Sequence, residues 1–359
     1  MSTATMHARL PILPVALAGL VISVAIVLYN LINQGHAAYG TDNLGMFWTF
    51  PIVVYDYFLL TSTGLAMVAT LALVFGGDDF RPIIKRALWL ALAGLAGGVA
   101  VLMLELGKPI QALWLIPFSF AFDSPLYWKV LCVLGYVLAL LWLFSRLSRT
   151  GWSMASVRGM ALLTLVLALG VTVIAGVVYG SQSMRPFWAS GDIPVAFLFE
   201  SLLGGLAFII FFTYMAYGFK QDGLPASVNR LFSDKLPSLL ALAIFLHMLF
   251  VLARMTSGLY GNAEGLQVWQ HIVASPLFHL ELWVGLVTPL VLLLLPTTRR
   301  IGSVQILAAL LVMISLFIAR YEYIIGGQLV PLFKGAWAPA LLSYSPSPTE
   351  WMLLHPPCP

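Results

Sequence analysis

Residues 49–76 read TFPIVVYDYFLLTSTGLAMVATLALVFG and carry a single charged side chain, Asp56. The hydrocarbon core of a bilayer is about 30 Å thick, and a helix needs roughly 20 mainly apolar residues to cross it. A helix on the surface of a soluble domain would instead combine an apolar stripe with a charged face. This stretch therefore predicts a transmembrane helix, with Asp56 in its first third.

Eight further apolar runs are long enough to cross a bilayer. They cover residues 11–33, 85–107, 125–146, 157–181, 193–219, 236–258, 276–297 and 303–326. The first run follows His7 and Arg9, as a signal peptide would, but it is longer than a typical signal core and no convincing small-residue cleavage site follows it. We expect it to be a retained helix. The predicted fold is an all-α membrane protein with nine transmembrane helices.

The composition supports a lipid environment. Hydrophobic residues make up 61% of the 359 residues and charged residues only 9%, whereas soluble domains carry about 25% charged residues. The net charge of +4 is spread over the loops without a basic patch, so nucleic acid is not an expected partner. Cys132 lies in an apolar run and Cys358 is the penultimate residue, so neither a disulfide framework nor a cysteine-ligated metal is indicated.

The lysines and arginines alternate between the two sides of the predicted helices. One side carries twelve of the 18, namely Arg9, Arg81, Lys85, Arg86, Arg146, Arg149, Arg158, Lys220, Arg230, Lys235, Arg299 and Arg300. The other side carries Lys108, Arg185 and Lys334, and Lys129, Arg254 and Arg320 lie within or at the edge of helices. By the positive-inside rule, the N-terminus is predicted to lie inside and the C-terminus outside.

Short motifs recur in the two halves of the chain. Gly64-Leu65-Ala66 precedes Ser124-Pro125-Leu126 by 60 residues, and Gly205-Leu206-Ala207 precedes Ser275-Pro276-Leu277 by 70 residues. Gln182 and Gln328 then follow after 58 and 53 residues. This order predicts two four-helix bundles related by a parallel repeat, with the first helix as an addition. The predicted units are residues 1–44 (extra helix and outer loop), 45–190 (first bundle), 191–330 (second bundle) and 331–359 (outer tail).

Ionisable side chains inside a bilayer are costly and are candidates for function. Nearly all of those in the predicted spans lie in the outer half, namely Asp56, Glu105, Glu200, His247, Arg254, His279, Glu281, Arg320 and Glu322. A transporter needs polar groups near the midplane with access from both sides. This distribution instead favours a polar pocket near the outer surface, which could hold the head of an amphipathic ligand such as a quinone while its tail stays in lipid.

Two roles are predicted for these residues. Proton transfer is assigned to Asp56, Glu200, His247 and Glu281. The quinone pocket or its surroundings is assigned to Tyr55, Asp56, Glu105, Arg185, Arg254, His279 and Arg320.

Structural roles are the alternative for several of them. Glu105, Arg185, His279 and Glu322 lie close enough to the interface to be solvated. Arg254 and Arg320 could pair with Glu200, Glu281 or Glu322 to hold the helices together. His247 and His279 are the only candidates for a bis-histidine haem, and they lie at different depths.

Four segments resemble the NrfD-like family, the quinone-interacting membrane subunits of polysulfide reductase and related complexes. They are Leu104-Glu105-Leu106-Gly107-Lys108-Pro109 running into Ser124-Pro125-Leu126-Tyr127-Trp128; Gln182-Ser183-Met184-Arg185-Pro186-Phe187-Trp188; His279-Leu280-Glu281-Leu282-Trp283-Val284-Gly285 with Pro289; and Arg320-Tyr321-Glu322-Tyr323 before Gly326-Gly327-Gln328. The likeness covers roughly residues 45–335.

The resemblance implies a bacterial cytoplasmic (inner) membrane protein with two four-helix bundles and a menaquinone or ubiquinone site near the outer surface. It also implies no haem or metal in this chain, a ferredoxin-like iron–sulfur subunit on the outer face, and a molybdopterin or other catalytic subunit beyond it.

The chain departs from the family pattern at several positions. Relatives use an Asn and a His on the first core helix, where this chain has Tyr55-Asp56 and no histidine. Glu105 stands where an Asp is usual. Longer relatives have a tenth helix after a segment like Tyr344-Ser345-Pro346-Ser347, so this chain is either a nine-helix member or one whose last helix is missing.

The predicted function is a quinone- or quinol-binding electron-transfer subunit of a respiratory or sulfur/nitrogen redox complex. A secondary transporter with a polar outer pocket and a purely structural anchor are the alternatives.

Overall fold

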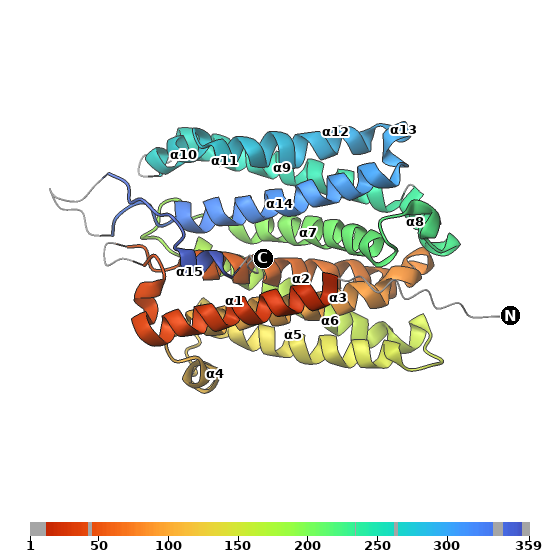
Figure 1. Ribbon diagram of the computed structural model, residues 1–359, viewed down its shortest axis with the longest axis horizontal. Helices are drawn as coiled ribbons and strands as arrows, with labels where there is room; N and C mark the ends of the chain where they lie inside the picture. The colour runs from red at the N-terminus through yellow and green to blue at the C-terminus, as the bar shows by residue number, and fades with distance from the viewer. Residues whose placement is uncertain (1–11, 42–44, 234, 262–264, 333–339, 354–359) are drawn as a thin grey trace.

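The computed structural model describes residues 12–41, 45–233, 235–261, 265–332 and 340–353, and every regular element within these ranges is a helix. Nine helices of this part of the chain are long and apolar enough to cross a membrane, which confirms the predicted fold class (Figure 1). They are α1 (Ile12–Gln34), α2 (Phe50–Phe75), α3 (Arg81–Glu105), α5 (Pro125–Ser148), α6 (Met154–Gly180), α7 (Ile193–Ala216), α9 (Lys235–Gly261), the combined span of α11 (Pro276–His279), η4 (Leu280–Val287) and α12 (Thr288–Leu294), and α14 (Gly302–Gly326).

Proline and glycine set several of the helix ends. α2 has Pro51 at its start and ends before Gly76, which has a φ of +77°. Proline has no N–H to leave unsatisfied in the first turn, and glycine adopts the left-handed conformation that closes a helix C-terminus. Ser153 begins α6 with a reciprocal capping box to Ser156. These local signals explain why the predicted helix ends agree closely with the observed ones.

Short helices outside the nine spans lie at the two ends of the bundle (Figure 1). α4 (Pro109–Phe118), α10 (Leu266–Val273) and α15 (Pro348–Trp351) lie toward one end, and α8 (Ala226–Ser233) and α13 (Pro296–Arg299) lie at the other. α10 buries Val268, Trp269 and Ile272 on one face. The two ends are called the α10 end and the α8 end below. The α10 end is the one that the sequence analysis predicts to be outside.

α2 is the central helix of the fold. It packs against α3, α6, α7 and α14, and most of its side chains are buried. α5 packs against α3 and α6, while α7, α9, α12 and α14 pack against one another at the other side of α2. The predicted division into residues 45–190 and 191–330, and the parallel repeat that relates them, stay predictions.

The outer surface of the bundle is apolar. α1 exposes Val21, Tyr29 and Ile32, and α5 exposes Leu138 and Trp142. Large apolar side chains of this kind are unfavourable in water and favourable in hydrocarbon. The helices satisfy their own backbone hydrogen bonds, as a lipid environment requires. Arg9, Lys334 and Cys358 lie outside the described residues.

Candidate functional site

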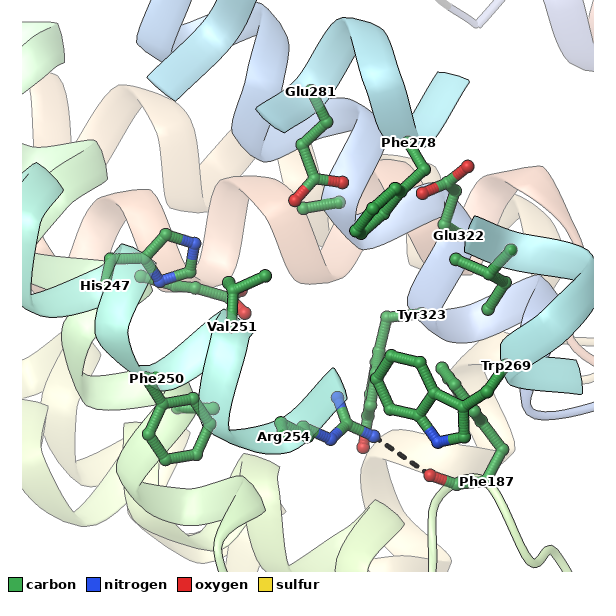
Figure 2. A pocket seen from close by; sticks show the side chains of 14 residues that line it. Phe187, His247, Phe250, Val251, Arg254, Trp269, Phe278, Glu281, Glu322 and Tyr323 are labelled. Carbon is green, nitrogen blue, oxygen red and sulfur yellow. Dashed lines mark hydrogen bonds between the residues drawn. The ribbon is translucent and has the colours of Figure 1, made fainter. Parts of the chain in front are cut away.

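A polar cavity lies among α7, α9, η4 and α14, close to α10 (Figure 2). Its volume is about 70 Å³, which is room for a few water molecules. The ionisable residues that line it are Glu200, His247, Arg254, Glu281 and Glu322. The aromatic residues that line it are Phe187, Phe250, Trp269, Phe278 and Tyr323. Four of the predicted site residues, from three different helices, therefore meet at one cavity.

Helical periodicity positions the residues of α9. His247, Val251 and Arg254 follow the i, i+4, i+7 spacing that places side chains on one face of a helix, and all three line the cavity. Arg254 donates a hydrogen bond to the carbonyl oxygen of Phe187 at 2.9 Å (Figure 2). Its guanidinium carbon also lies 4.8 Å from the ring centroid of Tyr323. These contacts fix the cation at the rim of the cavity nearer α10.

A π-helical segment carries Glu281. Pro289 has no N–H to donate back along the helix, and a proline inside a helix displaces the carbonyl four residues before it. The Thr288 backbone N–H donates to the Trp283 carbonyl oxygen, five residues earlier, and the Thr288 hydroxyl donates to the same oxygen at 2.9 Å. Segments with this wider turn are frequent at functional sites. The carboxylate of Glu281, which is 5% exposed, faces the cavity (Figure 2).

Several buried polar atoms around the cavity have no hydrogen-bond partner in the described part of the chain. They are both ring nitrogens of His247, one oxygen of Glu322, one guanidinium nitrogen of Arg320 and the hydroxyl of Tyr323. Buried polar groups are normally hydrogen bonded, to protein or to water. The His247 ring, which is 2% exposed, is therefore placed to bind waters or a polar ligand in the cavity.

An ion pair joins α7 to α14 beside the cavity. Arg320 donates to a carboxylate oxygen of Glu200, and its guanidinium carbon lies 4.1 Å from the ring centroid of Phe197. Arg320 is 1% exposed. The ion pair between Arg320 and Glu200, which is the structural alternative predicted for Arg320, is thus present. Glu200 also lines the cavity.

Asp56 lies in a neighbouring polar cluster and does not line the cavity. Lys129 on α5 donates to one oxygen of Asp56 at 3.2 Å, and the Tyr179 hydroxyl on α6 donates to the other at 2.5 Å. The Lys129 ammonium also lies 5.0 Å from the ring centroid of Tyr55. Asp56 and Glu200 thus belong to two different ion-paired clusters. That both carboxylates line or feed the quinone pocket stays a prediction.

The two clusters are close to each other. Arg320 interacts electrostatically with both Asp56 and Tyr179. A small cavity of about 10 Å³ lies beside the ion pair and is lined by Tyr57, Leu60, Thr61, Glu200, Leu316 and Arg320. This volume suits about one water molecule. Arg320 thus connects the two clusters: it pairs with Glu200 and interacts electrostatically with Asp56.

Three further predicted site residues do not line the cavity either. Arg185 is buried and donates to the carbonyl oxygens of Gly45 and Val330, at 2.6 and 3.2 Å. His279 is exposed, and its ring lies edge-on to the ring of Phe278 with a centroid distance of 5.9 Å. Glu105 is partly buried at the end of α3. Arg185 therefore links the loop at Gly45 to the loop at Val330.

Sequence reasoning leaves two residues of these clusters without a role. It places Lys129 only at a helix edge, and it does not single out Tyr179. The pairing of Lys129 with Asp56 could have been predicted from depth. Asp56 is the seventh residue of α2 and Lys129 is the fifth residue of α5, and both helices enter the membrane from the same side. An acid and a base at matching depth in lipid are expected to pair.

The fold and the site define a multi-pass α-helical membrane protein whose buried ionisable residues gather in the half of the bundle nearer α10. Residues 40–332 match the family described as polysulphide reductase, NrfD, and the chain belongs to this family. It is similar to the C subunit of the selenate reductase of Mesobacillus selenatarsenatis, with 24% identity over 353 residues that cover 85% of this chain and 80% of the relative. It is also similar to the C subunit of the polysulfide reductase of Wolinella succinogenes, with 24% identity over 224 residues that cover 57% of this chain and 69% of the relative.

Proposed function

We propose that this chain is the quinone-binding membrane subunit of a reductase-type redox complex. Its relatives are named as subunits of selenate and polysulfide reductases, which supports a role as one subunit of a larger assembly. In this proposal the chain lies in the bacterial inner membrane with its N-terminus inside, and the α10 end faces outward. A ferredoxin-like iron–sulfur subunit docks on that end, with a molybdopterin or other catalytic subunit beyond it.

The observation that carries the proposal is the cavity between His247, Arg254 and Glu281. A quinol that becomes a quinone loses two electrons and two protons, and the reverse reaction takes up the same number. A site for this reaction needs proton acceptors within reach of the two ring oxygens. The His247 ring, whose nitrogens have no protein partner among the described residues, and the Glu281 carboxylate meet this need.

Glu322 supports a route for the protons toward the α10 end. It lines the polar cavity and also a second cavity of about 310 Å³, which is lined by His271, Ser275 and Tyr344 among others. A carboxylate that lines two cavities is able to take a proton from one and release it into the other. Electrons would pass between the quinone and the iron–sulfur partner at the same end, because this chain is proposed to carry no redox centre of its own.

The test is quinol-dependent turnover of the intact complex in membranes, normalised to the amount of assembled partner. Glu281→Gln keeps the side-chain size but removes the titratable group, and His247→Phe removes both ring nitrogens. Loss of a general acid or base typically lowers a rate about 10²- to 10⁴-fold, and we expect falls of this order for both variants.

The matched control is Asp222→Asn, an acid-to-amide change at an exposed residue of the α8 end, which should turn over like the parent. Parent-like turnover of assembled Glu281→Gln and His247→Phe would show that the cavity is not the quinone site.

A further inference from the structure

An apolar groove runs along α7 between α2 and α9, on the side of the polar cavity nearer the α8 end. Its volume is about 440 Å³. The groove is lined only by apolar side chains and one glycine: Val68, Leu71, Ala72, Phe75, Gly77, Phe80, Phe199, Leu202, Leu206, Leu239, Leu242, Ala243 and Leu246. α7 packs against both α2 and α9, so it forms the floor and the other two helices form the walls.

The groove adjoins the polar cavity along two helices. On α9, Ala243 lines the groove and His247, one turn further, lines the cavity. On α7, Phe199 lines the groove and the adjacent Glu200 lines the cavity. Phe199 and Phe250 meet at the junction with a centroid distance of 6.2 Å. A ligand could therefore lie with one end in each space.

We propose that the groove holds the isoprenoid tail of the quinone whose head binds in the polar cavity. This inference rests on the proposed function and adds the direction of the ligand: head toward the α10 end, tail toward the α8 end. Because the cavity of about 70 Å³ is small, head binding requires the Phe199–Phe250 pair to separate.

The charges favour a quinone tail over a phospholipid chain. A phospholipid lying in this half of the membrane would place its headgroup at the α8 end of the groove, where the lining residues are Gly77 and Phe80. Neither offers charge to a headgroup. The cations of this end, such as Arg81 and Lys235, do not line the groove, and Lys235 is paired with Asp79. The polar groups that could hold a head lie at the opposite end, around His247 and Arg254.

Groove-filling variants test the proposal in the intact complex. Leu242→Trp adds bulk inside the groove, and Ala243→Leu is a milder variant of the same kind. Leu249→Trp is the control, because Leu242 and Leu249 are 53% and 48% exposed on the same helix but Leu249 lines neither space. Each is assayed with a quinol that carries a decyl or isoprenoid tail and with a tail-less quinol of the same ring.

The expected result is a KM about tenfold higher for the tailed quinol in Leu242→Trp, since apolar pockets discriminate by about this factor for small changes in fit. The KM for the tail-less quinol in Leu242→Trp, and the KM for both quinols in Leu249→Trp, should match the parent values.

Equal effects on the two quinols, or no effect on either, would overturn the tail assignment. If Leu242→Trp instead changes only the thermal stabilisation given by added phospholipid, the groove is a lipid site and the assignment is also wrong. Failure of the parent complex to oxidise either quinol would contradict the proposed function itself, which is a distinguishable outcome.

Discussion

Gly64 on α2 and Gly205 on α7 face each other where the two helices cross. A Cβ atom added to Gly205 would lie 2.3 Å from the carbonyl carbon of Gly64, and one added to Gly64 would lie 1.6 Å from the carbonyl oxygen of Ser201. These glycines begin the two Gly-Leu-Ala motifs of the predicted repeat. Small residues allow transmembrane helices to approach this closely. The contact therefore sets the distance between the helices that carry Asp56 and Glu200.

Gly64→Ala should destabilise the protein, because the new methyl group would overlap the backbone of α7. Overpacking of this kind costs about 1–3 kcal/mol. The control is Gly97→Ala, since a Cβ at Gly97 meets nothing within 4 Å. The measurement is thermal unfolding of the purified protein in detergent. A loss for Gly97→Ala that equals or exceeds the loss for Gly64→Ala would contradict the packing.

Asp56→Asn should reduce stability because it leaves the Lys129 ammonium unpaired inside the bundle. Breaking a buried ion pair by removing one partner costs about 3–5 kcal/mol, whereas removing both charges is often close to neutral. The double variant Asp56→Asn/Lys129→Met should therefore recover most of the loss, as a double-mutant cycle would reveal. Asp79→Asn breaks the exposed pair with Lys235 and should have little effect. Full stability of the single Asp56→Asn variant would show that the pair does not matter energetically.

The topology can be checked with reporter fusions. Fusions after Gly77 and after Arg300, which lie at the α8 end, should report the cytoplasm. A fusion after Gly261, at the far end of α9, should report the opposite side. A cytoplasmic signal at Gly261 would contradict the predicted orientation of the second half of the chain.

The purified protein, separated from its partners, should show no visible absorption from haem or iron–sulfur clusters. His247 and His279 are the histidines that the sequence offers for a bis-histidine haem, and the structure places His247 inside the cavity but leaves His279 exposed. The measurement is the visible spectrum in the oxidised and reduced states. A stoichiometric Soret band would contradict this prediction, and His247 and His279 would again be candidate haem ligands.

The number and extent of the transmembrane helices were predictable from the sequence alone. Each span must bury about 30 Å of backbone in hydrocarbon, so a run of apolar residues is required, and proline and glycine mark many of its ends. The depth of each ionisable residue follows from its position in such a run. For this reason the apolar pattern is enough to assign Glu200, His247, Arg254 and Glu281 to one half of the membrane.

The partners of these residues were decided by the tertiary structure. Side-chain direction depends on the rotation of each helix about its axis, which is set by contacts with helices remote in the sequence, such as the crossing of α2 and α7 at Gly64. This rotation turns Asp56 toward Lys129 and Tyr179, and it turns Glu200 toward Arg320 and the cavity. It also places the Arg185 side chain against loop carbonyls. The sequence determined which charges lie in the membrane, and only the packing of the helices decided which of them meet, because an apolar run specifies length and depth but carries little information about rotation.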